Sequence, residues 1–379
     1  MEITEHIYKG LDNGKMTGVV SLDLSKAFDS IDHGILMVKL IKYIGKGQAS
    51  DLIQNYMKDR KQLVKIGGIA SSTRSIMYGV PQGSVLGPIL FLLYVNDIVD
   101  CVSHCRMSMY ADDTNIYYSS YHACNIQHAL NEDLATLKTW FDLNRLKLNV
   151  EKSSFMIVKS NRNTRRTNEN IFVGSRKIAE ENDIKILGVR IDNRMNVKYS
   201  LRAFSRAAKY INKDTAIILY NSAIASRLNY CDVIWSPTGT TLQNSVQVIQ
   251  NTAARRVVGA RDRHASQPLL SELGWVSLKD KRELHKIVLF KKILNGKGPC
   301  SLLEELETYR RTTNRVIRSN QDNIVKKSCR TEYGKRLYFN GVIGSWNQLP
   351  PTIKSTNNLK SFKEKLHEHM LHRCRRSLI

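Results

Sequence analysis

The stretch MSMYADDTNIYY, residues 107–118, has the pattern of a β-hairpin. Its two ends, Met107 to Tyr110 and Ile116 to Tyr118, are short runs rich in apolar and aromatic residues, which favour strands. Its middle, ADDTN, is small and polar, as turns are. We therefore predict a hairpin that carries two carboxylates, Asp112 and Asp113, at or beside its tip.

A third carboxylate stands at the end of another predicted strand. Val19 to Leu22 reads as a short buried strand that ends at Asp23. If that strand pairs with the hairpin in one sheet, Asp23, Asp112 and Asp113 converge, and a metal ion would relieve their mutual repulsion. Two Mg²⁺ ions held by such hard oxygen ligands, ~3.5–4 Å apart, are what nucleotidyl transfer needs. Each acid alone is more often a cap or a solvated turn residue, so the prediction rests on all three.

The remaining pattern predicts helices around a small sheet. One helix is expected from Asp32 to a stop at Gly45, and another after Ser50 as its N-cap. The stretch GVPQGSVLGPILFLLYVNDI, residues 79–98, begins as a Gly/Pro loop and becomes an apolar helix, and Leu130 to Phe141 has helical spacing. Beyond Ser200 the pattern is mostly helical. The fold class predicted is α+β, with a small antiparallel sheet and packed helices followed by a helical region.

The charge of the chain is large and unevenly placed. The formal net charge is +24, yet the first 120 of the 379 residues contain 12 Lys or Arg and 12 Asp or Glu, so the whole excess lies in the rest. A basic region of this size favours a polyanionic partner, and nucleic acid is the first candidate. The pattern is that of a catalytic region joined to a region that grips a polyanion.

Several other classes of protein are disfavoured. Seven cysteines in this length do not form a disulfide scaffold, and the N-terminal MEITEHIYKG is not a signal peptide, so we expect an intracellular protein. The nucleus is compatible with this, and the sequence does not decide the compartment. No apolar run has the ~18 residues that cross a bilayer, so no membrane partner is expected. Cys101, His104 and Cys105 lie close together, but no second Cys/His pair follows at zinc-finger spacing, which favours plain thiols.

Five segments in order resemble the successive motifs of reverse transcriptases. Their residues are similar to those of jockey-like and LINE-like non-LTR retrotransposons. The resemblance covers Thr4 to about Asn196 closely and the rest more weakly. The segments are DLSKAFD (23–29), PQGSVLGPILF (81–91), YADD (110–113), LNVEKS (148–153) and ILGVRID (186–192).

The resemblance assigns roles to the acids and to their neighbours. Asp23 and Asp112 would ligate two Mg²⁺ ions, which Mn²⁺ could replace, with Asp113 in support and the backbone carbonyl of Leu24 as a further ligand. Phe28 would exclude a ribose 2′-hydroxyl, because its ring leaves no room for that group. The loop beneath the incoming dNTP would be formed by Pro81, Gln82, Gly83 and Ser84.

Other residues would serve the leaving group and the nucleic acid. Lys152 matches the position proposed to protonate pyrophosphate, and Leu187 with Gly188 resembles the hairpin that grips the primer. A predicted helix after Ser200 has an apolar stripe and a basic stripe, which suits a thumb on a duplex backbone. The basic stripe consists of Arg202, Arg206, Lys209 and Lys213.

The resemblance also implies an organisation. We expect a palm with a remnant of fingers at 1–158, a basic linker and primer-grip hairpin at 159–198, a helical thumb at 199–265 and a basic helical region at 266–379. An RNA template, a DNA primer, their duplex and dNTPs would be the partners. Because only 22 residues precede Asp23, we expect the upstream fingers and endonuclease to lie outside this chain, and its activity alone to be weak or absent.

Three alternatives stay open at this point. One is a non-catalytic, nucleic-acid-binding remnant of a retrotransposon. The second is a maturase of the group II intron type, although SKAFDSIDH and SWNQLP favour the retrotransposon. A zinc-dependent binding module is a distant third.

Overall fold

The computed structural model describes residues 1–160, 169–192, 212–237, 240–260, 266–313 and 323–376. The chain forms two compact units. One is Lys15–Asn193, and the other combines Met1–Gly14 with Arg194–Ile379. The four predicted segments make a finer division, which stays a prediction, and the structure adds that the first helix belongs with the C-terminal unit.

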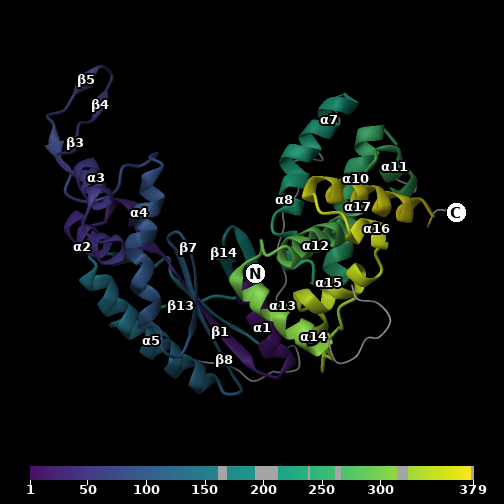
Figure 1. Cartoon of the computed structure of the whole chain (residues 1–379), viewed down its shortest axis with the longest axis horizontal. Helices are drawn as coiled ribbons and strands as arrows, with labels where there is room; N and C mark the ends of the chain where they lie inside the picture. Colours follow the sequence, from purple (N-terminus) through teal and green to yellow (C-terminus); the bar gives the residue numbers. More distant parts are fainter. Residues whose placement is uncertain (161–168, 193–211, 238–239, 261–265, 314–322, 377–379) are drawn as a thin grey trace. The chain divides into compact units, whose positions relative to one another are not determined.

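The centre of the unit Lys15–Asn193 is a five-stranded sheet in the order β13-β10-β1-β8-β7 (Figure 1). β1 runs antiparallel to both β10 and β8, and β7 pairs antiparallel with β8. The predicted strand and hairpin therefore share one sheet. β13 pairs parallel with β10, so the sheet is mixed at this edge and not wholly antiparallel as predicted. The strands are β1 (Met16–Leu22), β7 (Arg106–Tyr110), β8 (Asp113–Ser120), β10 (Ser154–Val158) and β13 (Ala179–Glu180).

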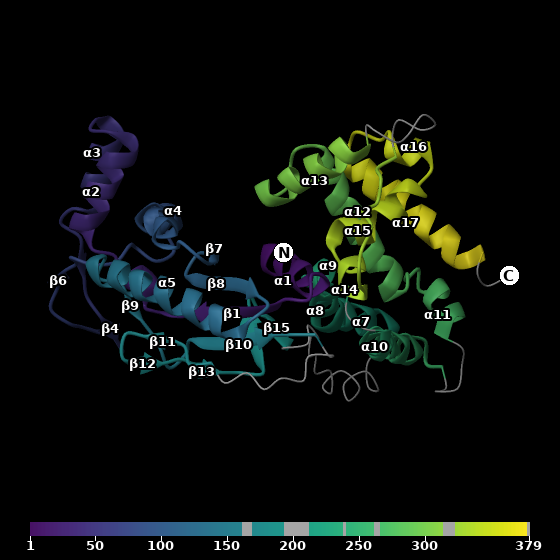
Figure 2. The same ribbon diagram turned by 90° about the horizontal axis from the view of Figure 1, so that it is seen from below.

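One long helix, α5 (Ala123–Leu143), packs along β1 and β8 (Figure 2). The residues that predicted it, Leu130 to Phe141 at helical spacing, bury Leu130, Leu134, Leu137 and Phe141 in the core. Gly18 permits the close approach, because a Cβ there would stand 2.3 Å from the Ile126 side chain. The sheet face beneath α5 is thus fixed by tight packing.

A helical and hairpin region extends from this sheet. α2 (His33–Ile44) begins and ends as predicted, since Asp32 caps it through Ile35 N–H at 3.0 Å and Gly45 ends it. α3 (Gln48–Met57) corrects the prediction that Ser50 is the N-cap. Gly47 is the cap, and its N–H donates to Ser50 Oγ at 2.9 Å from the third helical position.

The short elements of this unit complete the region around the sheet. Two-residue strands form the hairpin of β4 and β5, which extends beyond α3 (Figure 1). The apolar helix α4 (Leu86–Val95) follows its Gly/Pro loop as predicted. The other elements are β2 (Leu24–Ser25), η1 (Ala27–Asp29), β3 (Lys61–Gln62), β4 (Lys65–Ile66), β5 (Ile69–Ala70), β6 (Arg74–Ser75), η2 (Asn96–Cys101), β9 (Lys147–Leu148), β11 (Phe172–Val173), β12 (Arg176–Lys177), β14 (Asp183–Ile186) and β15 (Val189–Asp192).

The second unit is helical among its described residues, and a buried apolar cluster around α12 and α15 forms its core. The π-helical segment η3 (Tyr220–Ala225) joins α7 to α8. The helices are α1 (Glu2–Asp12), α7 (Lys213–Leu219), α8 (Ser226–Asn229), α9 (Asp232–Trp235), α10 (Thr240–Val258), α11 (Ser266–Glu272), α12 (Leu278–Leu294), α13 (Cys300–Thr313), α14 (Glu332–Lys335), α15 (Tyr338–Asn347), α16 (Pro351–Lys354) and α17 (Leu359–Arg376).

The first helix is tied into this unit by polar contacts with residues more than 300 positions away. Glu5 Oε1 accepts the Tyr338 N–H at 2.7 Å, which caps α15. Asp12 Oδ1 accepts both the N–H and the hydroxyl of Thr331, at 2.8 and 2.7 Å. Since each carboxylate satisfies donors at the start of a helix, α1 helps to hold the C-terminal helices together.

The mixed helix-and-sheet class is confirmed at this coarse level, with a sheet in one unit and helices in the other. The description of these units as palm and thumb stays a prediction. Across the described ranges, no helix combines the length and the apolar character that crossing a bilayer requires.

Candidate active site

The strand register brings the three predicted acids to one end of the sheet. Leu22 at the end of β1 pairs with Thr114 on β8, so Asp23 and Asp113 are the next residues on two neighbouring strands. Tyr110 pairs with Asp113, which leaves Ala111 and Asp112 as a two-residue turn, tighter than the five-residue turn predicted. Ala111 has φ +53°, as such tight turns require.

The charges of the three acids act on one another. Partial burial first, and then the charges of Asp112 and Asp23, raise the pKa of the Asp113 carboxyl above its ordinary value. The charge of Lys185 on β14 opposes this shift. Sequence reasoning missed Lys185, because only the fold brings its strand to this end of the sheet.

The backbone at Asp23 is held from the neighbouring turn. The Asp23 N–H donates to Ser153 Oγ at 3.2 Å, and the Asp23 carbonyl accepts the Asn149 N–H at 2.8 Å. Ser153 is buried, and its hydroxyl in turn donates to the Asn149 carbonyl at 2.8 Å. Ser153 closes the LNVEKS motif and was not predicted as a site residue. Ser153 therefore helps to fix the backbone of Asp23 at the end of the sheet.

The donor set suits a hard divalent cation. Asp112 and Asp113 are exposed, and all three ligand candidates offer carboxylate oxygens. In the part of the chain that is described, no group of three or more His, Cys, Asp or Glu side chains is placed so that it could hold a metal ion. The three acids are near enough to influence one another's charge, but they do not form a metal-ligand group in this structure. Because Mg²⁺ keeps waters and substrate phosphates among its ligands, they would supply only part of its coordination shell.

Phe28 lies on a 3-10 turn that is fastened to the loop before α4. Its ring is tilted against that of Phe91, with centroids 4.7 Å apart, and its carbonyl accepts the Val80 N–H at 3.0 Å. Gly79 has φ +83°, and a Cβ there would stand 2.9 Å from Asp29 Cα. Only glycine permits this close passage of two backbones.

The predicted nucleotide loop lies beside the same turn. Gln82 Nε2 donates to Asp29 Oδ1 at 2.7 Å, so the amide that was predicted to contact a nucleotide is bonded to the second acid of DLSKAFD. Ser84 Oγ donates to the Pro81 carbonyl and accepts the Gly87 N–H, which shapes the entry to α4. Phe28 and this loop therefore lie beside each other, and their role in binding a dNTP stays a prediction.

The other predicted site residues are placed as follows. Lys152 is exposed on the turn before β10. Leu187 and Gly188, both with positive φ, form the turn of the β14–β15 hairpin. Lys213 begins α7, with its Nζ 3.1 Å from Glu272 Oε1. Arg202, Arg206 and Lys209 lie outside the described residues, and all these roles stay predictions.

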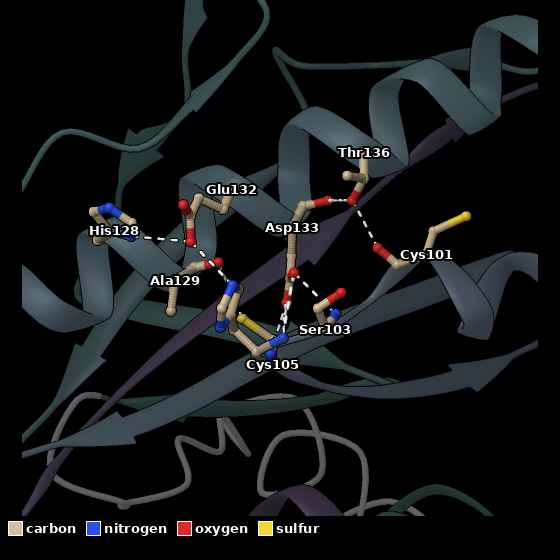
Figure 3. A network of polar contacts seen from close by, with 9 residues as sticks. Cys101, Ser103, Cys105, His128, Ala129, Glu132, Asp133 and Thr136 are labelled. Atoms are coloured by element: carbon tan, nitrogen blue, oxygen red, sulfur yellow. Dashed lines mark hydrogen bonds and ion pairs between the residues drawn. The ribbon is translucent and has the colours of Figure 1, made fainter.

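The Cys101, His104 and Cys105 segment is organised around a carboxylate. Asp133 on α5 is 1% exposed and accepts the backbone N–H groups of Ser103 and His104 at 3.0 Å and of Cys105 at 2.6 Å (Figure 3). This buried acid anchors the loop that leads directly into β7. The start of β7, the first strand of the hairpin, is therefore anchored to α5.

The side chains of this segment also have other partners. His104 Nε2 lies 3.0 Å from Glu132 Oε2, and Cys105 Sγ donates to the Ala129 carbonyl at 3.6 Å. Burial first, and the charge of Asp133 next, raise the pKa of the Cys105 thiol, which opposes the thiolate that zinc binds. The plain-thiol interpretation fits this geometry.

Comparison with known proteins adds an independent finding. The family described as "Reverse transcriptase (RNA-dependent DNA polymerase)" matches residues 3–191. A "Probable RNA-directed DNA polymerase from transposon BS" of Drosophila melanogaster is 27% identical in an alignment of length 281 that covers 67% of this chain and 30% of that protein. The "RNA-directed DNA polymerase from mobile element jockey" of Drosophila funebris is 24% identical in an alignment of length 273 that covers 66% of this chain and 29% of that protein.

These matches cover only part of the known proteins. The chain spans about 30% of the length of the curated relatives that it matches. Among solved structures, a telomerase from Candida tropicalis in complex with a fragment of telomeric RNA is similar with a TM-score of 0.41 and 12% identity. That likeness covers 72% of this chain and 43% of the telomerase.

Proposed function

The chain belongs to the reverse transcriptase (RNA-dependent DNA polymerase) family, with relatives among non-LTR retrotransposon polymerases, and from this premise we propose that it catalyses RNA-directed DNA synthesis. The reaction is the transfer of a deoxynucleotide from a dNTP to the 3′-hydroxyl of a primer. Asp23, Asp112 and Asp113 form its centre. The observation that carries the proposal is their convergence at adjoining ends of β1 and the β7–β8 hairpin.

The acids are the groups that would hold divalent ions. The family generally uses such ions, and the finer assignment to two Mg²⁺ at Asp23 and Asp112, with Asp113 and the Leu24 carbonyl in support, is part of the proposal. When bound, the ions supply Lewis-acid activation of the attacking hydroxyl and neutralise the leaving pyrophosphate. Burial raises the pKa of Asp113 most, and the negative charges of Asp112 and Asp23 raise it further. A cationic ligand at this place would relieve that repulsion.

The neighbouring residues orient the substrate. The Phe28 ring, packed against Phe91, presents a flat apolar surface where a 2′-hydroxyl would find neither room nor a partner. Gln82 and Gly83 border the same space, and Lys152 is the candidate donor of a proton to pyrophosphate. The RNA template, the DNA primer and the dNTPs are accordingly the proposed partners.

Primer extension on an RNA template, with dNTPs and Mg²⁺, tests the activity. Incorporation that is abolished in the double variant Asp112→Asn/Asp113→Asn supports the proposal. Because the relatives are longer, binding of Mn²⁺ measured by electron paramagnetic resonance gives a readout besides turnover. Wild-type protein that neither extends a primer nor binds Mn²⁺ more tightly than the double variant would favour the non-catalytic remnant instead.

A further inference from the structure

The C-terminal unit contains a groove between two helices that the proposed polymerase site does not use. α12 and α17 lie side by side (Figure 1), and the groove between them has a volume of about 420 Å³. This is within the usual range for a site that takes a small ligand group. The groove is lined by Leu284, His285, Val288, Leu289 and Lys292 of α12 and by Lys363 and His367 of α17.

The lining has an apolar floor and a cationic rim. Leu284, Val288 and Leu289 recur on one face of α12 and pack against the apolar core of the unit. Lys363 and His367 are four residues apart, so they share one face of α17. The rim therefore offers two lysines and two histidines above an apolar surface.

The acids that the structure describes on the surrounding helices do not neutralise the two lysines of this rim. Arg373 pairs with Asp280 at 2.6 Å and with Glu283 at 2.9 Å, so the two acids of the first turns of α12 are occupied. Among the described residues, no acid lines the groove, and none lies within ion-pair distance of Lys292 or Lys363. The two lysines are thus available to an anionic ligand.

His285 is oriented by a buried acid. Its Nδ1 lies 2.5 Å from Oδ2 of Asp232, whose side chain is 4% exposed, whereas the His285 side chain is 34% exposed. With Nδ1 occupied, Nε2 is the nitrogen left for a ligand. In a charged ring Nε2 donates to a phosphate oxygen, and in a neutral ring it accepts from a hydroxyl or an amino group.

We propose that this groove binds a single-stranded segment of nucleic acid, with backbone phosphates on the cationic rim and a base or sugar against the apolar floor. His285 and Lys292 are seven residues apart, which is about 10 Å along a helix. A row of cations at that separation suits a chain of repeated phosphates, whereas a lipid headgroup or a free phosphate presents one compact charge. The groove belongs to the helical unit, whereas the acids of the proposed polymerase centre belong to the unit Lys15–Asn193.

Residue-resolved histidine modification tests the site directly in the full chain. Diethyl pyrocarbonate is applied with and without a thymidine oligonucleotide of about 20 nucleotides, a length that covers a single-strand binding site. We expect the oligonucleotide to slow the modification of His285 and His367. His372, which is exposed on α17 and does not line the groove, serves as the internal control.

Two outcomes of this experiment overturn the proposal. One is equal modification of all three histidines with and without the oligonucleotide. The other is protection by phosphatidylserine vesicles and not by the oligonucleotide, which would make the groove a lipid site. Repeating the measurement in Asp112→Asn/Asp113→Asn keeps the groove distinguishable from the polymerase centre, because protection should persist there.

A pair of matched variants tests the lysines. Lys292→Gln/Lys363→Gln removes two charges from the groove, and Lys360→Gln/Lys365→Gln removes two charges from exposed positions of α17 outside it. The groove variant should weaken oligonucleotide binding roughly tenfold and reduce the slope of log K against log salt by about 1.4. Equal losses in both variants would show that net charge alone binds the strand, and the groove would have no special role.

Discussion

In the unit Lys15–Asn193, Asp112 stands exposed on the two-residue turn of the hairpin, and Asp113 stands exposed at the start of β8. In the helical unit, by contrast, Glu5 and Asp232 are 7% and 3% exposed, and each is bonded to a group on another helix. A buried carboxylate without partners would destabilise the fold, so the buried acids are held by donors. An exposed cluster of like charges contributes little to folding and is open to a ligand.

This difference separates two roles of the same side chain. Acids on the hairpin should govern catalysis and leave stability nearly unchanged, because their contacts with the rest of the protein are few. Acids of the helical unit should govern stability, because they hold α1 and α9 to the helices around them. Substitutions in the two regions therefore test whether the hairpin acids affect activity and the buried acids affect stability.

The largest effect is expected at the hairpin. Asp112→Asn should lower primer extension by about 10³-fold, or about 4 kcal/mol in the barrier, because a neutral amide holds a divalent cation poorly. Since the side chain is exposed, the free energy of unfolding should change by no more than about 0.5 kcal/mol. Extension assays and urea unfolding measure the two quantities. Asp142→Asn, another exposed acid of this unit, is the control, and an equal loss of activity there would contradict the assignment.

Glu5 should show the opposite behaviour. Burial, the largest cause, raises its pKa to about 7, so the folded state binds a proton more tightly than the unfolded state. Stability should then fall as the pH rises from about 4.5 through about 7, by about 3 kcal/mol in total. Glu5→Gln keeps the acceptor for Tyr338 N–H and should remove this pH dependence.

Urea unfolding at a series of pH values measures the effect of Glu5. Glu2→Gln, exposed on the same helix, is the matched control and should keep the pH dependence of the wild type. If Glu5→Gln also keeps it, then buried acids of the helical unit do not set stability in the way the comparison requires.

A smaller change is expected when Phe28 is shortened. Phe28→Ala opens space beneath the sugar, so discrimination between dNTPs and rNTPs should fall by about 10²-fold. The ratio of kcat/KM for the two substrates measures this. Phe28→Tyr retains the ring and should retain discrimination. A loss of rate that is equal for both substrates would assign Phe28 to the core, where it contacts Phe91.

The smallest effect distinguishes two glycines of the loop before α4. Gly79→Ala should cost about 2 kcal/mol of stability or more, because a left-handed conformation is combined with a close contact to the Asp29 backbone. Gly83→Ala, also at positive φ but with nothing within 4 Å of the new Cβ, should cost about 1 kcal/mol. Equal losses in the free energy of unfolding would mean that the close contact between Gly79 and the Asp29 backbone does not contribute to stability.

Much of the local structure could be predicted from the sequence. The predicted strand before Asp23, the helix from Asp32 to Gly45 and the helical spacing of Leu130 to Phe141 all appear. These features depend on contacts within a few residues, namely alternation, helical period and capping side chains. The start of α3 was missed because Ser50 bonds back to Gly47, which a serine can do from inside the first turn.

The sequence by itself determined the family and predicted which acids form the site, since motif order and residue type are read along the chain. Only the tertiary structure decided that Ser153 holds Asp23, that Lys185 faces Asp113, and that α1 joins helices more than 300 residues away. The groove on α12 and α17 also depends on the packing of two helices about 80 residues apart in the chain. Contacts between distant segments leave no periodic or capping signal in either segment, so they become visible only when the chain is folded.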